Sequence, residues 1–124
     1  MAPIYFIIMS EKRCRVIEEY QSSDPDPLII TKGEILRFER KESEWAGWIW
    51  CVNKRGKGGW VPENYLEVQE NNCEALQDYN AVELTVITGD EFMIDKEESG
   101  WYWVHDEGTG REGWVPMKNV RIME

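Results

Sequence analysis

The sequence is poor in the residues that build catalytic and metal-binding sites. Its 124 residues include one histidine, His105, and three cysteines, with no Cys-x-x-Cys pair. A zinc site needs several Cys or His ligands at short spacing, and a disulfide framework needs an even number of cysteines. No nucleophile–base pair and no convincing cofactor motif is recognisable. We therefore expect no metal, no cofactor and no enzymatic activity.

Positive charge is also scarce. The chain has 14 Lys and Arg against 24 Asp and Glu, which gives a net charge of −10. Residues 1–68 carry a net charge of −1 and residues 69–124 a net charge of −9. A nucleic-acid binder needs a basic surface, and a negative field repels anionic lipid headgroups. We expect neither nucleic acid nor membrane as a partner, and the field favours cationic ones.

The sequence lacks a long hydrophobic run. The apolar residues 4–9 are too few to span a bilayer, and they lack the basic region and cleavage site of a signal peptide. A cytoplasmic location is the resulting expectation. We predict that residues 1–12 are an N-terminal extension in which residues 4–9 form a strand. That strand would join a barrel of this chain or a second copy of the chain, giving a homo-oligomer.

Tryptophan, in contrast, is abundant, and the seven tryptophans lie mostly in blocks that recur. Residues 47–50 (Gly-Trp-Ile-Trp) recur at 100–103 (Gly-Trp-Tyr-Trp), and residues 59–62 (Gly-Trp-Val-Pro) recur unchanged at 113–116. Self-similarity at a fixed period indicates a repeated structural unit, here of about 55 residues. We place the two units at residues 13–68 and 73–124.

Both units carry the pattern of short β-strands. Apolar and polar residues alternate at 36–39 and 92–95, which is typical of half-buried strands. Glycine-containing segments at 53–58 and 106–110 predict hairpin turns. We predict an all-β chain of two tandem five-stranded small barrels, because closure removes the sheet edges that small domains would otherwise expose. The join at 67–73 is short, so we expect the barrels to be closely packed.

These blocks resemble the signatures of the SH3 family. Residues 75–79 (Ala-Leu-Gln-Asp-Tyr) are similar to its ALYDY motif, and residues 59–66 are similar to its terminal GWVPxNYL signature. The resemblance covers about residues 13–124, twice over. It implies a barrel that binds proline-rich segments in polyproline II form across a row of aromatic side chains. Such segments are stiff before binding, so little chain entropy is lost.

The resemblance also implies site residues. In the first unit the peptide-binding positions are Tyr20, Asp24, Asp26, Trp48, Trp60, Pro62 and Tyr65. In the second unit the corresponding secondary positions are Tyr79, Glu83, Trp101, Trp114 and Pro116. The second unit has Gln77 and Asn119 where the family has tyrosines, so we expect the first unit to bind extended, proline-containing, basic segments.

Other interpretations stay open at this point. Trp60 and Trp114 could be partly structural, whereas Trp48 and Trp101 are expected at the surface. Trp45 could line the groove or pack against the N-terminal strand. The alternative function is that of a structural or assembly subunit, whose aromatic patches are buried in a permanent protein interface.

Overall fold

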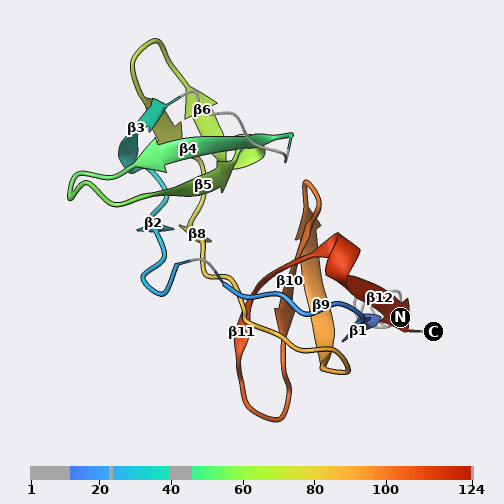
Figure 1. Cartoon of the computed structure of the whole chain (residues 1–124). Helices are drawn as coiled ribbons and strands as arrows, with labels where there is room; N and C mark the ends of the chain where they lie inside the picture. Colours follow the sequence, from blue (N-terminus) through green and yellow to red (C-terminus); the bar gives the residue numbers. More distant parts are fainter. Residues whose placement is uncertain (1–11, 23, 40–45, 124) are drawn as a thin grey trace, which may run out of the picture. The chain divides into compact units, whose positions relative to one another are not determined.

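The computed structural model describes residues 12–22, 24–39 and 46–123 (Figure 1). The predicted strand at residues 4–9 and the side chain of Trp45 lie outside these ranges. Within them, no helix is long and apolar enough to cross a membrane. Two short 3₁₀ turns stand among the strands, so the predicted all-β class is confirmed.

The described chain divides into two compact units, which we treat separately. The insert unit is the contiguous stretch Asp24–Val82. The split unit combines residues 12–22 with residues 83–123. Each unit contains one five-stranded sheet, as the sequence predicted.

The sheet of the split unit has the strand order β11-β10-β9-β1-β12. Its strands are β1 (Lys12–Val16), β9 (Glu91–Glu98), β10 (Trp101–His105), β11 (Glu112–Pro116) and β12 (Val120–Met123). A 3₁₀ turn, η2 (Met117–Asn119), joins the last two strands. Alternate side chains are buried in β1 and in the first half of β9, whereas residues 113–116 of β11 are all buried. The core gathers around Val16, Phe92 and Val104.

The sheet of the insert unit has the equivalent order β5-β4-β3-β7-β6. Its strands are β3 (Ile35–Glu39), β4 (Trp48–Val52), β5 (Gly58–Pro62), β6 (Leu66–Val68) and β7 (Cys73–Ala75). A two-stranded pair of β2 (Ile29–Ile30) and β8 (Tyr79–Asn80) completes the unit, and η1 (Glu63–Tyr65) precedes β6.

The predicted hairpin turns are present in both units. Asn53, buried at the start of the β4–β5 turn, accepts hydrogen bonds from the backbone N–H groups of Arg55 and Lys57. Gly56 and Gly110 have φ of 84° and 78°, a region that favours glycine. The alternation of the sequence and its turn residues therefore agree with the strands observed.

The compact units do not coincide with the sequence repeats. β1 belongs to the first repeat, but it lies between β9 and β12 of the second. β7 belongs to the second repeat, but it lies between β3 and β6 of the first. The two repeats have exchanged their first strands. The boundaries expected from sequence, 13–68 and 73–124, describe the repeats, whereas each barrel is built from both.

Candidate functional site

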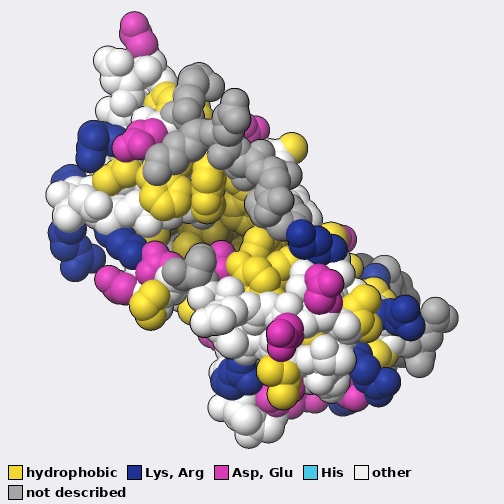
Figure 2. All heavy atoms as spheres, in the orientation of Figure 1, with side chains coloured by type: hydrophobic (Ala, Val, Ile, Leu, Met, Phe, Trp, Pro, Cys, Tyr) yellow, Lys and Arg dark blue, Asp and Glu magenta, His cyan; other side chains and the backbone are white. Residues whose placement is uncertain are grey.

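The insert unit carries an aromatic face on β4 and β5. Trp50 stands opposite Trp60, and Trp48 stands opposite Pro62, so the four side chains share one face of the hairpin. The rings of Trp50 and Trp60 meet edge to face with centroids 5.2 Å apart. All three tryptophans are half-buried. Hydrophobic side chains gather on the face of this unit that Figure 2 shows.

Two tyrosines extend this aromatic face. Tyr65 of η1 and Tyr79 of β8 pack edge to face at 5.4 Å, and the Tyr79 hydroxyl donates to the carbonyl oxygen of Trp60 at 3.0 Å. The sequence placed Tyr20 beside Trp48 in this site. That prediction is wrong, because the strand exchange places Tyr79 in the insert unit and Tyr20 in the split unit.

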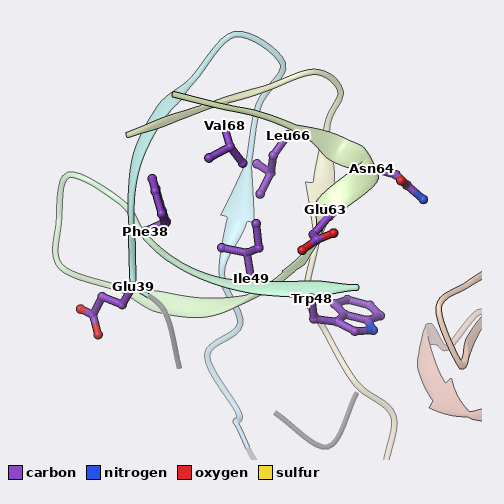
Figure 3. Close-up of a pocket in the computed structure, with 8 residues that line it drawn as sticks. All are labelled: Phe38, Glu39, Trp48, Ile49, Glu63, Asn64, Leu66 and Val68. Carbon is purple, nitrogen blue, oxygen red and sulfur yellow. The ribbon is translucent and has the colours of Figure 1, made fainter. Parts of the chain in front are cut away.

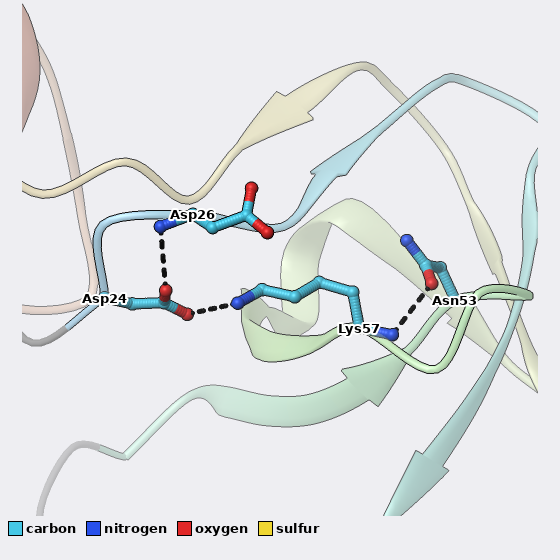
Figure 4. Close-up of polar contacts among 4 residues, drawn as sticks. All are labelled: Asp24, Asp26, Asn53 and Lys57. Atoms are coloured by element: carbon cyan, nitrogen blue, oxygen red, sulfur yellow. Dashed lines mark hydrogen bonds and ion pairs between the residues drawn. The ribbon is translucent and has the colours of Figure 1, made fainter.

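The predicted acidic anchors, Asp24 and Asp26, lie in the insert unit with the other expected residues. Lys57 Nζ contacts the Asp24 carboxylate at 2.6 Å, and Asp24 also accepts the backbone N–H of Asp26 at 2.9 Å (Figure 4). Hydrogen bonding from Lys57 holds the pKa of Asp24 below its usual value. Lys57 is itself fixed through its backbone N–H by Asn53. The anchor is therefore ionised and already paired.

A pocket of about 590 Å³ opens beside Trp48 (Figure 3). Apolar side chains line it together with two carboxylates, Glu39 and Glu63. The lining residues are Phe38, Glu39, Trp48, Ile49, Glu63, Asn64, Leu66 and Val68. An apolar wall with carboxylates suits a Lys or Arg side chain, whose stem is aliphatic and whose head is cationic.

The tryptophans equivalent to Trp48 and Trp60 are less accessible in the split unit. Tyr20 packs edge to face on Trp101 at 5.7 Å, and its hydroxyl donates to Glu83 at 2.6 Å. Trp101 is only 7% exposed and Trp114 only 2%. The expectation that Trp101 lies at the surface is therefore wrong, because Tyr20 packs against its ring. Pro116 is buried, as is its equivalent Pro62 in the insert unit.

The sequence did not predict the contacts of two residues of the split unit. Lys96 lies over the rings of Trp103 and Trp114 at 5.8 and 5.7 Å, which is cation–π geometry. Asn119 is 3% exposed and donates to the backbone carbonyls of both Glu18 and Glu19. The side-chain amide of Asn119 thus fixes the backbone just before Tyr20. In the insert unit, Trp50 could have been found from its spacing of two residues from Trp48.

The described residues hold no group of three metal-ligating side chains. All three cysteines are free and buried. Burial raises the pKa of the Cys14 thiol to about 11, and it also raises the pKa of Cys51 and Cys73. A thiol with a raised pKa is a poor nucleophile at neutral pH. The chemistry of both surfaces is that of aromatic contact and charge pairing.

The fold and the aromatic surfaces are those of a protein-interaction module. The variant SH3 domain family matches residues 13–69 and again residues 71–123. The chain belongs to this family, whose domains are non-catalytic binding modules. Each family segment covers one sequence repeat, and hence parts of both compact units.

Three known proteins are similar in sequence to this chain. Protein nervous wreck of Drosophila melanogaster is 34% identical over 61 residues, which is 49% of this chain and 6% of the relative. Human CD2-associated protein is 34% identical over 67 residues, 54% of this chain and 10% of the relative. Mouse SH3 and PX domain-containing protein 2A is 25% identical over 115 residues, 90% of this chain and 10% of the relative. The chain therefore spans only a small part of these relatives' length.

Proposed function

We propose that the chain is a non-catalytic module that binds extended, proline-containing, basic protein segments on the insert unit. The observation that carries this proposal is the aromatic face in which the half-buried Trp48 and Trp60 stand with the buried Pro62 and Tyr65, and in which the buried Tyr79 takes the place expected for Tyr20. Flat rings separated by grooves suit the prolines of a polyproline II segment, which loses little entropy on binding.

The second expected feature of the ligand is positive charge. A basic side chain of the ligand would enter the pocket beside Trp48, where Glu39 and Glu63 supply carboxylates. Asp24 and Asp26 would hold a further cationic residue, in competition with Lys57. The net charge of −10 accelerates encounter with a cationic segment, and this contribution weakens with salt.

The split unit supports a lesser role in ligand binding. Trp101 and Trp114 are buried, and Glu83 already accepts the hydroxyl of Tyr20. Because these rings pack within the chain itself, a structural role is the second candidate function for the split unit. A ligand that binds with equal affinity to both units would contradict the assignment.

The test is calorimetric titration of the full chain with peptides rich in proline and arginine. We expect Trp48→Ala to weaken binding by at least about tenfold, because a few buried aromatic rings carry most of the energy of such interfaces. Trp103→Ala, at a half-buried position of the split unit, is the matched control and should bind like the parent chain. Equal losses in the two variants, or no binding by the parent chain, would contradict the proposal.

A further inference from the structure

The first strands of the two repeats occupy equivalent places. In the split unit Cys14 of β1 stands opposite Phe92 of β9, and in the insert unit Cys73 of β7 stands opposite Leu36 of β3. Phe92 and Leu36 hold matching positions in the two repeats, because each lies three residues after the matched glycine. Either strand could therefore enter either barrel without a change of register.

The two strands differ in one side chain that each buries. Val16 of β1 is 1% exposed and belongs to the core of the split unit with Val86 and Val120. Ala75 of β7 is also 1% exposed and stands opposite Leu66. If each repeat retained its own first strand, Val16 would overfill the insert unit and Ala75 would leave a cavity in the split unit. Both changes are destabilising in a close-packed core.

Surface charges favour the alternative, retained pairing, in which each repeat keeps its own first strand. In the exchanged pairing Arg15 contacts Glu91 at 2.9 Å, but it also stands opposite Arg121, and Glu74 stands opposite Glu67. In the retained pairing Arg15 would face Glu67, and Glu74 would face Arg121 on one side and Glu91 on the other. Exposed pairs contribute little, so we expect the buried side chains to decide the pairing.

We propose that Val16 and Ala75 are positioning residues that select the exchanged pairing. They thereby decide which tyrosine completes which aromatic site, Tyr79 in the insert unit and Tyr20 in the split unit. The effect on ligand choice rests on the proposed function, whereas the selection of strands does not.

The cysteines provide a direct readout of the pairing. Cys51 and Cys73 lie 3.8 Å apart between their sulfur atoms in the insert unit. In the retained pairing Cys14 would replace Cys73 beside Cys51, since the two cysteines occupy matching positions six residues before Tyr20 and Tyr79. Oxidation of the equilibrated folded chain therefore gives a different disulfide for each pairing.

The experiment maps these disulfides in the full chain and in the double variant Val16→Ala/Ala75→Val. We expect the disulfide of Cys51 with Cys73 to exceed that of Cys51 with Cys14 by at least about tenfold in the parent chain, and the ratio to fall at least about tenfold in the variant. The matched control exchanges two exposed side chains of equal size, Ile17→Leu/Leu76→Ile, and should keep the parent ratio.

A second measurement serves where the buried thiols oxidise slowly or the variant unfolds. Nuclear Overhauser contacts from the Ala75 methyl group of the parent chain should reach Leu66 and not Val120. Predominance of the Cys14 disulfide or of the Val120 contact in the parent chain would overturn the proposal. A variant that keeps the parent ratio, or a disulfide that forms only between two chains, would overturn it as well.

Discussion

In the insert unit Lys57 already forms an ion pair with Asp24, with 2.6 Å between Nζ and the carboxylate. A basic ligand residue would have to displace this contact. Both side chains are partly exposed, so the pair is worth little on its own, but it competes directly for the same oxygen atoms.

We predict that Lys57→Met raises the affinity for a proline- and arginine-rich peptide by about two- to fivefold at low salt, because Lys57 then no longer competes with the ligand for the Asp24 carboxylate. Calorimetric titration measures the effect. Lys54→Met removes a charge from the same turn without touching Asp24 and is the control for net charge. A loss of affinity in Lys57→Met would show that Lys57 supports the ligand site.

At the residue scale, the sequence predicted which side chains gather in the insert unit but not how open they are. The motif positions of Trp48 and Trp101 are the same, and yet one is half-buried and the other 7% exposed. Trp101 is covered by the ring of Tyr20, which comes from a distant part of the chain. No local pattern around Trp101 carries that information.

At the scale of elements, β5 lies close to the chain that enters β2. A Cβ atom at Gly59 would lie 2.8 Å from Cβ of Leu28, which is fully buried. Neither atom sits at the end of a flexible side chain, so the strand itself would have to move.

We predict that Gly59→Ala lowers the free energy of unfolding by about 1–3 kcal/mol, as expected for overpacking in a core. Urea unfolding followed by fluorescence measures the change. The control is Gly108→Ala, where the nearest atom to an added Cβ is Asp106 Oδ1 at 3.4 Å, and it should stay within about 0.5 kcal/mol of the parent chain. Equal stability of Gly59→Ala and the parent would contradict the packing described here.

The strands and turns themselves follow from local pattern, whereas their partners do not. Alternation predicted the strands around Leu36 and Phe92, and glycine predicted the hairpins that precede Trp60 and Trp114. Local pattern does not predict which first strand joins which barrel. Both candidates offer a cysteine and a small apolar residue two positions later, so alternation alone fits either barrel.

At the scale of the whole molecule, the insert unit is one uninterrupted stretch of chain. All strands from β2 to β8 lie within Asp24–Val82, and its compact boundary cuts both sequence repeats. A barrel that is complete within a contiguous segment has what it needs to fold alone.

We predict that a fragment of residues 24–82 folds into a barrel with dispersed nuclear magnetic resonance signals and cooperative thermal unfolding. A fragment of residues 24–72 lacks β7 and β8 and should remain unfolded, because the strand that joins β3 to β6 would be missing from the sheet. The reverse result, or two unfolded fragments, would show that the insert unit depends on the rest of the chain.

The order in which the strands are synthesised also bears on the strand exchange. A ribosome releases the chain from its N-terminus at roughly 5–20 residues per second, so β1, β3 and β6 are all available before β7 emerges. During that interval β1 is available to the nascent barrel, while β7, β9 and β12 have not yet been made. The order of synthesis therefore favours one partner for β1 and the finished cores favour another. A nascent barrel that closed around β1 would have to release it before β1 could pair with β9 and β12.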